Sequence, residues 1–265
     1  VNSSLVIDCS KYLTRILDLD VKRARCTVEP GIVLDELNRQ LKPHGLWFPV
    51  DISTSSRATI GGMAGNNSCG GRSMRYGTMR DNVASIEALL ADGTLAHFGR
   101  IGGSLKDVPS PLRPLAKDLL AIGAREADEI AERFPKVQRR VGGYNLDAFV
   151  DADAPVNLTK IMVGSEGTLG VVVEGRIRLV PLPKATAVMT IQFGELLQAL
   201  EATPAILPHR PAAVEVMDLT KDPGALVVGR DMRTSGPKMA AAFIDGVLSR
   251  GVNVVDIGLS STDQL

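Results

Sequence analysis

The sequence predicts an α+β protein: a mixed, largely antiparallel sheet flanked by helices, followed by a short βαβ unit at the C-terminal end. Residues 24–29 alternate polar and apolar side chains, as a half-buried strand does. Residues 83–98 indicate two strands joined at Asp92-Gly93, a dipeptide typical of hairpins. Residues 32–41 and 112–134 have the composition of helices that could cover such a sheet.

The remaining elements follow from the same rules. In residues 32–41 the leucines at 34, 37 and 41 share one helical face, and a Lys-Pro-His-Gly sequence at 42–45 ends the helix. The other predicted elements are a strand at 5–8, a helical turn at 11–17, a strand at 160–163, a turn at 164–167, a strand at 168–173 that continues through 176–180, and a domain boundary at 181–183.

Composition excludes several classes of function. The 265 residues include 30 Lys and Arg and 30 Asp and Glu, so the formal net charge is zero, and only 4% of the residues are aromatic. A nucleic-acid binder would need a basic stripe or aromatic stacking platforms, and neither is present. No apolar run approaches the roughly 18 residues of a membrane span. We therefore expect neither a nucleic-acid partner nor a membrane span.

The three cysteines carry information about the compartment and about metals. Cys9, Cys26 and Cys69 are far apart in sequence and form no Cys-x-x-Cys pattern. This spacing argues against a disulfide scaffold, a zinc finger and an iron–sulfur cluster built from this chain alone. We expect a protein of the reducing cytoplasm without a metal site.

Residues 61–71 are the least ordinary stretch, with five glycines around Asn66, Asn67 and Ser68. A loop of this kind exposes many backbone N–H groups and can wrap closely around a phosphate. It can equally be a loop that simply turns twice, and composition does not decide between the two. Neither Gly-x-Gly-x-x-Gly nor the P-loop pattern is present. Gly-x-Ser-x-Gly is also absent, and with only three histidines a hydrolase triad is improbable.

Residues 51–78, which include this stretch, resemble the second flavin loop of FAD-linked oxidases with a PCMH-type FAD-binding domain. This is the vanillyl-alcohol oxidase superfamily, which includes glycolate oxidase, D-lactate dehydrogenase and D-2-hydroxyglutarate dehydrogenase. Three further stretches are similar to the same family in the same order: Leu89-Leu-Ala-Asp-Gly-Thr94, Gly143-Tyr-Asn-Leu146 and Val163-Gly-Ser-Glu-Gly-Thr-Leu-Gly170. Four ordered matches are far more specific than one.

The resemblance implies FAD as cofactor and hydride transfer from a small 2-hydroxy acid to the flavin. The residues that it places at the cofactor are Ser53, Thr54, Ile60, Gly61, Gly62, Asn66, Ser68, Gly70, Gly71, Tyr76, Gly77, Glu166, Gly167, Thr168 and Gly170. Arg139 and Arg140 could clamp the substrate carboxylate, or could belong to a solvated turn. Residues 139–146 look most like the large bacterial flavoproteins with a C-terminal iron–sulfur module. Such a module, or another electron acceptor, would be a partner outside this chain.

The chain departs from the family at both ends. The family has an earlier glycine-rich loop, before the stretch that matches residues 5–8, and this chain begins with Val1 after that loop. We therefore expect the isolated chain to bind FAD weakly or not at all. The predicted domains are an N-terminally truncated FAD-binding domain at 1–181, the start of a substrate or cap domain at 182–222, and a different segment at 223–265.

Residues 225–258 resemble the first domain of the phosphohexomutases, phosphomannomutase and phosphoglucomutase. The pattern is a βαβ unit with a strand at 226–228, a helix that begins near Ser235, and a second strand at 252–257. Arg230 and Arg233 match the family's Gly-Arg-Asp-x-Arg element, but its phosphate-transfer loops would lie beyond Leu265. The alternatives to an oxidoreductase are therefore a mutase fragment or an inactive chimeric fragment, and the tail can also be a mere α/β appendage.

Overall fold

The computed structural model of the protein describes residues 6–101, 105–137, 139–151, 155–216, 226–230, 245 and 254–259. The chain divides into two compact units. One contains Val1–Gln192 and Glu201–Glu215, and the other contains Phe193–Leu200 and Val216–Leu265. The domain boundaries expected at residues 181 and 222 remain predictions.

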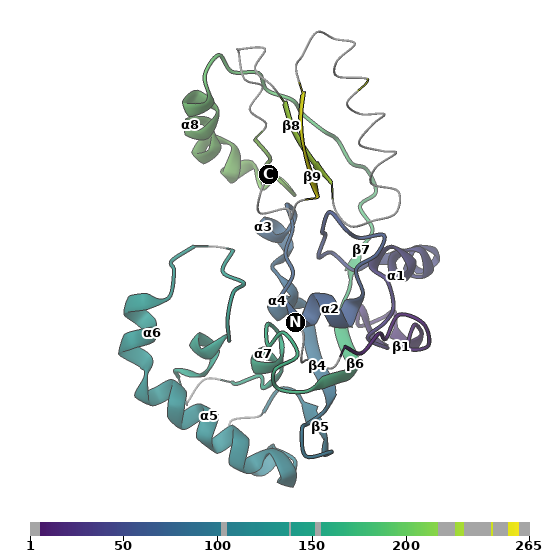
Figure 1. Ribbon diagram of the computed structural model, residues 1–265, viewed down its shortest axis with the longest axis vertical. Coiled ribbons are helices and arrows are strands. Elements are labelled where there is room, and N and C mark those ends of the chain that lie inside the picture. Colours follow the sequence, from purple (N-terminus) through teal and green to yellow (C-terminus); the bar gives the residue numbers. More distant parts are fainter. Residues whose placement is uncertain are drawn as a thin grey trace. The chain divides into compact units, whose positions relative to one another are not determined.

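A five-stranded sheet forms the centre of the first unit (Figure 1). All of its neighbouring strands are antiparallel, in the order β1 (Ile16–Asp20), β2 (Arg25–Val28), β6 (Val171–Arg178), β4 (Val83–Leu89) and β5 (Leu95–Phe98). A second, two-stranded sheet pairs β3 (Leu46–Trp47) with β7 (Val180–Pro181). The predicted α+β class with a largely antiparallel sheet is confirmed.

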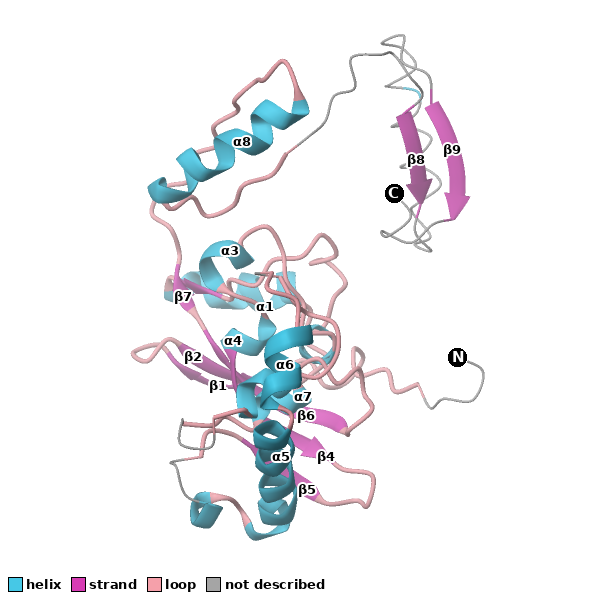
Figure 2. Cartoon of the chain, turned by 90° about the vertical axis from the view of Figure 1, so that its left-hand side faces the viewer, coloured by secondary structure: helices cyan, strands magenta, loops and turns pink. Residues whose placement is uncertain are grey.

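Figure 2 shows the helices of the described part of the chain in cyan. They are α1 (Leu34–Leu41), α2 (Ile60–Gly65), α3 (Ser73–Tyr76), α4 (Met79–Asn82), α5 (Arg113–Arg125), α6 (Ala127–Arg133), α7 (Thr159–Met162) and α8 (Leu196–Ile206). Short 3-10 segments lie at Lys42–His44, Leu105–Asp107, Ser110–Leu112, Leu146–Phe149 and Leu207–His209. Of the helices, α2 contacts β6, and α4 and α7 contact β4. None of the helices in the described part of the chain has the length and apolar content for a membrane crossing.

The core lies on one face of the five-stranded sheet, because side chains alternate between the two faces of a strand. Cys26 and Val28 of β2 are buried, whereas Arg25 and Thr27 are not. The same alternation buries Ile86 and Ala88 of β4 and Ala96 and Phe98 of β5, and Ile86 pairs directly with Phe98 inside the core. Alternation in the sequence is therefore a reliable guide to which face of these strands is covered.

Several predicted elements of the first unit are confirmed. Helix α1 buries Leu34, Leu37 and Leu41, and it is followed by Gly45 at a φ of 69°, a left-handed conformation that favours glycine. The hairpin at 83–98 forms with its turn at Asp92-Gly93. Two helices, α5 and α6, occupy the predicted helical region at 112–134, and β6 is one strand through most of the 168–180 region.

The predicted strand at 5–8 and helical turn at 11–17 are wrong for the residues that the structure describes. Val6 is 80% exposed and belongs to no strand. Asp8 instead begins a turn, because its carboxylate accepts hydrogen bonds from the amide and the hydroxyl of Ser10. The edge of the sheet is formed by β1, in which Ile16 pairs with Val28. Two apolar residues beside a turn-forming Asp and Ser were not enough to make a strand.

The predicted strand at 160–163 is also wrong, because these residues belong to helix α7. The side-chain oxygen of Asn157 accepts the amide of Thr159 at 3.0 Å at the start of this helix. The Thr159 hydroxyl donates to the carbonyl of Phe98 at 2.9 Å and fastens the helix to the end of β5. A short apolar run is compatible with either a strand or a buried helical turn, and here these tertiary hydrogen bonds decide.

The first half of the glycine-rich stretch is helical rather than a loop. Thr59 precedes α2, and its hydroxyl oxygen accepts the amide of Gly62 at 3.3 Å as an N-cap. The amide of Gly61 donates to the carbonyl of Pro30 at 2.7 Å. Glycine normally disfavours helices. In α2 the cap, the contact with Pro30 and the burial of Ile60, Met63 and Ala64 compensate.

In the second unit, β8 (Leu226–Arg230) and β9 (Val254–Leu259) pair in parallel. This arrangement agrees with the predicted first strand and with the described part of the second strand. Parallel neighbours require a crossover connection, as the βαβ interpretation supposes. Between the strands only Asp245 is described, and it is helical. Ser235, Arg233 and the rest of the predicted helix lie outside the described residues.

Two glycines of α2 provide a matched pair of substitutions. A Cβ at residue 61 would lie 2.5 Å from Cβ of Pro30, whereas a Cβ at residue 65 would meet nothing within 4 Å. We expect Gly61→Ala to lower the free energy of unfolding by about 1–3 kcal/mol through overpacking. Gly65→Ala should raise it by about 0.4–1 kcal/mol, because alanine favours a helix. Urea unfolding of both variants tests this, and equal effects of the two would contradict the packing of α2 against Pro30.

The three free cysteines should differ in reactivity. Cys26 is buried in β2, and burial together with the charge of Asp18 raises the pKa of its thiol to about 12. Cys9 and Cys69 are half-buried. Because the thiolate is the reactive form, we expect Cys26 to be alkylated at least about tenfold more slowly than the other two in native protein near pH 8. Peptide mapping by mass spectrometry measures the three rates, and rapid labelling of Cys26 would show that β2 is not packed as described.

Candidate functional site

Two of the distant motifs meet at the C-terminal end of helix α2. The amide of Gly164 donates to the carbonyl of Ala64, and the amide of Glu166 donates to the carbonyl of Gly65, both at 2.9 Å. The last carbonyls of a helix lack their regular partner four residues further on, and the turn supplies donors to two of them. The carbonyl of Ala64 also accepts the amide of Asn67 at 3.2 Å. We call the region formed by the end of α2 and the turns at 142–145 and 163–168 the motif junction.

The third motif, at 142–145, packs against the same place. A Cβ at residue 164 would lie 3.2 Å from the carbonyl oxygen of Gly143 and 3.4 Å from Cβ of Asn67. Gly164 also has a φ of 89°, a left-handed conformation. Position 164 therefore favours glycine both for this conformation and for the small space beside Gly143. The Tyr144 hydroxyl and Thr168 Oγ1 are 2.7 Å apart and join the two turns at the surface. Three motifs that are widely separated in sequence therefore form one place in the structure.

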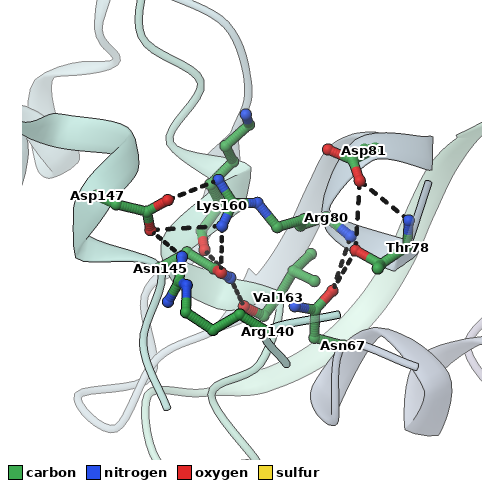
Figure 3. Close-up of polar contacts among 9 residues, drawn as sticks. All are labelled: Asn67, Thr78, Arg80, Asp81, Arg140, Asn145, Asp147, Lys160 and Val163. Atoms are coloured by element: carbon green, nitrogen blue, oxygen red, sulfur yellow. Dashed lines mark hydrogen bonds and ion pairs between the residues drawn. The ribbon is translucent and has the colours of Figure 1, made fainter. Parts of the chain in front are cut away.

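A half-buried group of charged side chains lies beside the motif junction (Figure 3). The carboxylate of Asp147 accepts hydrogen bonds from Arg80 at 3.0 Å and pairs with Arg140 at 2.5 Å. The two arginine side chains are only 18% and 14% exposed. Arg80 Nη1 also donates to Oδ1 of Asn145 at 2.9 Å. Arg80 thus binds two acceptors of the 145–147 segment with one guanidinium group.

Two asparagine side chains extend this network to the backbone. Nδ2 of Asn145 donates to the carbonyls of Val163 at 2.8 Å and Lys160 at 3.2 Å, where α7 ends. Oδ1 of Asn67 accepts the amide of Arg80 at 2.9 Å and the hydroxyl of Thr78 at 3.1 Å. Asn67 is buried at a φ of 53°, and its Nδ2 has no hydrogen-bond partner among the described residues. The network therefore links residue 67, α4, the 140–147 segment and the end of α7.

The charges of this group influence one another. Burial alone would raise the pKa of Asp147, but the hydrogen bonds from Arg80 and Arg140 outweigh it and hold this pKa below its usual range. Burial lowers the pKa of the Lys160 ammonium group, and the positive charge of Arg80 lowers it further. Asp147 is therefore ionised at neutral pH and holds the two guanidinium groups together.

The residues predicted to bind FAD fall in several places. At the motif junction lie Asn66, Glu166, Gly167 and Thr168, which are exposed. Half-buried Ser68 and Gly170 lie just outside it, and a Cβ at residue 170 would be 2.8 Å from the carbonyl oxygen of Leu89. In α2 itself Ile60 is buried, Gly61 is half-buried against Pro30, and Gly62 is exposed.

The other predicted residues lie away from the motif junction. Ser53 and Thr54 are exposed in the turn at 52–58, whose carbonyls accept the first amides of α1. Tyr76, followed by Gly77, packs edge-on against Trp47. Gly70 lies so close to Asp51 that a Cβ would be 1.9 Å from its carbonyl oxygen, and Gly71 is next to it. The structure thus brings together only part of the predicted set.

The expectation that the glycine-rich stretch offers free backbone amides is largely wrong. Its donors are already used: Ile60 and Gly61 donate to the 30–32 segment, Gly62 and Met63 to Thr59, Asn66, Asn67 and Ser68 to carbonyls of α2, and Gly70 to Ser73. Beside α2 lies a small apolar cavity of about 10 Å³, lined among others by Ile60, Gly61 and Gly175, which is too small for a diphosphate. Because these amides are already used, a cofactor at this stretch would be bound by side chains and by contact with the exposed backbone of the glycines.

The surface of the motif junction does suit a flat or extended ligand. At Gly65, Gly142, Gly143 and Gly167 a Cβ would meet no atom within 4 Å, so the backbone is bare and approachable. Asn66, Ser68 and Thr168 supply neutral hydrogen-bonding groups beside it. The residues present therefore fit FAD, with neutral side chains and bare backbone in place of the free amides that the sequence led us to expect.

The two arginines predicted to bind a carboxylate are in different situations. Arg140 is half-buried, pairs with Asp147 and lies 4.6 Å over the ring of Phe134. Arg139 is exposed. The interpretation of the sequence missed Arg80, Asn145 and Asp147 as members of a network. Arg80 and Asp147 closely follow two of the motif stretches, and Asn145 lies inside one, which was the available signal in the sequence. Residues 80 and 147 are too far apart in sequence for their pairing to be expected.

Comparisons with known proteins agree with this picture. Residues 1–99 match the family model described as FAD binding domain, and residues 205–265 match phosphoglucomutase/phosphomannomutase, alpha/beta/alpha domain I. The chain is 32% identical over 222 residues to a D-2-hydroxyglutarate dehydrogenase of Pseudomonas putida, which covers 82% of this chain and 22% of that protein. It is 29% identical over 236 residues to the glycolate oxidase subunit GlcD of Bacillus subtilis, and this match covers 88% of this chain and 40% of that subunit.

Among solved structures, an alkyldihydroxyacetonephosphate synthase is 21% identical, with a TM-score of 0.42, over 67% of this chain and 25% of that one. The chain spans about a fifth to two fifths of the length of the two curated relatives. The resemblance inferred from the four motifs and from the tail is confirmed by the family models and the relatives. The first part of the chain is thus similar to FAD-binding proteins of the FAD-linked oxidase type, and its end is similar to the phosphohexomutases.

Proposed function

We propose that this chain is part of an oxidoreductase that uses FAD to oxidise the CH–OH group of a small 2-hydroxy acid. The observation that carries the proposal is the meeting of the motifs at the end of α2, where Gly164 and Glu166 bind its last carbonyls. The similarity to a D-2-hydroxyglutarate dehydrogenase and to a glycolate oxidase subunit supports this substrate class. Which hydroxy acid is used is not part of the proposal.

In this proposal the protein supplies binding and orientation. Bound FAD supplies a two-electron oxidation in which a hydride leaves the carbon of the C–OH group and the hydroxyl proton is released, which gives a 2-oxo acid. Asn66 and Thr168 at the motif junction would hydrogen-bond the cofactor, with Gly65 and Gly167 allowing close approach. The remaining residues predicted at the cofactor, among them Ser53, Thr54, Tyr76 and Gly77, stay part of the proposal.

Arg139 is the better candidate for the substrate carboxylate, because its side chain is exposed while Arg140 is occupied by Asp147. A guanidinium group binds a carboxylate through two parallel hydrogen bonds. The electrons must then pass to an acceptor outside this chain, and we propose an iron–sulfur module or another electron carrier. A reducing, cytoplasmic setting is also part of the proposal, in keeping with the three unpaired cysteines.

A phosphosugar mutase fragment is the second candidate function. The match of residues 205–265 and the parallel pairing of β8 with β9 favour this origin for the tail. We expect no hexose-phosphate isomerisation from the 265 residues, because only residues 205–265 match a domain of that family. Detectable conversion of glucose 1-phosphate to glucose 6-phosphate would contradict this expectation.

Binding of FAD can be tested with Cys69, which is half-buried in the glycine-rich stretch between Ser68 and Gly70. If FAD lies over this stretch, saturating FAD should slow alkylation of Cys69 by about tenfold or more, because a bound ligand excludes the reagent. Cys9 lies outside the predicted contacts and serves as the reference thiol in the same sample. The rates are measured by peptide mapping during an FAD titration to millimolar concentration.

Trp47 provides a second, independent signal because it is the only tryptophan of the chain and packs against Tyr76. Its fluorescence should be quenched by FAD over the same concentration range in which Cys69 is protected. If FAD leaves both the Cys69 rate and the Trp47 emission unchanged, or slows Cys9 equally, the proposed use of this stretch is wrong.

A further inference from the structure

We propose that Asp147 is a positioning residue for the motif junction. Through Arg80 and Asn145 it holds the turn at 163–168 against the end of α2. This inference rests on the proposed function in one respect only: the turn matters because Glu166, Gly167 and Thr168 are expected to contact FAD. The geometry of the network carries the rest.

The first step is the fixation of Arg80 by Asp147. Both oxygens of the carboxylate are used: Oδ2 binds Arg80 Nη2 at 3.0 Å, and Oδ1 binds Arg140 Nη2 at 2.5 Å. Figure 3 shows the carboxylate facing the Arg80 guanidinium group, with Arg140 of the same 140–147 segment beside it. One negative charge brings two half-buried positive side chains together. Without it we expect the two guanidinium groups to move apart or toward solvent, because a half-buried charge without a partner is unfavourable.

The second step leads from Arg80 to the two asparagines. Nη1 of Arg80 holds Oδ1 of Asn145 at 2.9 Å, and the backbone amide of Arg80 holds Oδ1 of Asn67 at 2.9 Å. Each asparagine oxygen therefore has a defined donor, which orients the rest of the amide group. Arg80 thus connects α4 both to the residue that follows α2 and to the turn at 142–145.

The third step reaches the motif junction. With its oxygen held by Arg80, Asn145 directs Nδ2 to the carbonyls of Lys160 and Val163, at the start of the turn. The next amides, of Gly164 and Glu166, bind the end of α2. Glu166, a residue other than glycine, has a φ of 52° in this turn. Such backbone conformations persist only where surrounding contacts enforce them.

The alternative is that Asp147 merely stabilises the fold. The two roles differ in where the molecule loosens when the carboxylate is removed. A positioning role predicts local opening of the 163–168 turn with the rest of the unit intact, whereas a general role predicts a uniform loss of stability.

Asp147→Asn tests this, because it keeps the shape of the side chain but removes its charge. We expect hydrogen–deuterium exchange of the Gly164 and Glu166 amides to become about tenfold faster, while exchange in β4 and β6 changes by less than about twofold. The protection of Cys69 by FAD should require about tenfold more FAD, since a tenfold change in affinity corresponds to about 1.4 kcal/mol.

Arg113→Gln is the matched control. Arg113 also donates to backbone carbonyls, those of Val108 at 2.9 Å and Lys106 at 3.3 Å, but it has no part in the network. This variant should leave exchange at 164–168 and the FAD dependence of Cys69 unchanged. Combining Asp147→Asn with Arg80→Gln should add little to either single change, because groups that act as one unit are not additive.

The exchange measurement is made without FAD and decides the inference even if the proposed cofactor use fails. Unchanged exchange at Gly164 and Glu166 in Asp147→Asn, or the same change in Arg113→Gln, would overturn the inference. Faster exchange together with no FAD protection of Cys69 in the unmodified protein would retain the positioning role and reject the proposed function. Faster exchange with unaltered FAD dependence would show that the turn does not contribute to cofactor binding.

Discussion

The candidate site depends on two backbone hydrogen bonds, from the amides of Gly164 and Glu166 to the carbonyls of Ala64 and Gly65. The last carbonyls of a short helix lack their regular helical partners, and a carbonyl without any partner is costly when buried. The 163–168 turn donates to both carbonyls, and Asn67 is a further donor to that of Ala64. The turn and the end of the helix therefore hold each other in place. The glycine-rich helix and the Gly-Ser-Glu-Gly turn are therefore complementary parts of one structure.

This dependence explains which elements the sequence predicts correctly. The strand at 25–28 and the helix at 34–41 follow from the spacing of apolar residues, which marks the buried face of each element. Local periodicity is therefore sufficient to predict them. The segments at 60–65 and 159–162 were assigned wrongly because hydrogen bonds from Gly61 to Pro30 and from Thr159 to Phe98 help to decide their conformation. Contacts between distant residues cannot be read from a window of the sequence.

The same limit applied to the site. Motif resemblance located the turns, but it did not show that the amides of the glycine-rich stretch are consumed within the chain. Nor did it indicate that Arg140 is already paired with Asp147. Asp147 is held in place by Arg80, which belongs to another part of the chain, and this contact is not visible in the sequence. What glycine contributes here is mainly space: Gly61 allows contact with Pro30, and Gly65 and Gly167 leave the backbone bare. Three glycines of similar appearance in sequence thus have two different physical roles.

The charged network adds direction to the apolar packing of these segments. Met79 of α4, and Ile161 and Met162 of α7, belong to the apolar core, but apolar packing is not directional and tolerates rotation of one segment against another. The guanidinium group of Arg80 presents several donors in a fixed plane, so binding Asn145 and Asp147 together defines both the distance and the orientation of that segment. Because the turn at 163–168 follows directly from the carbonyls that Asn145 binds, this orientation passes on to the residues of that turn, which we propose contact FAD.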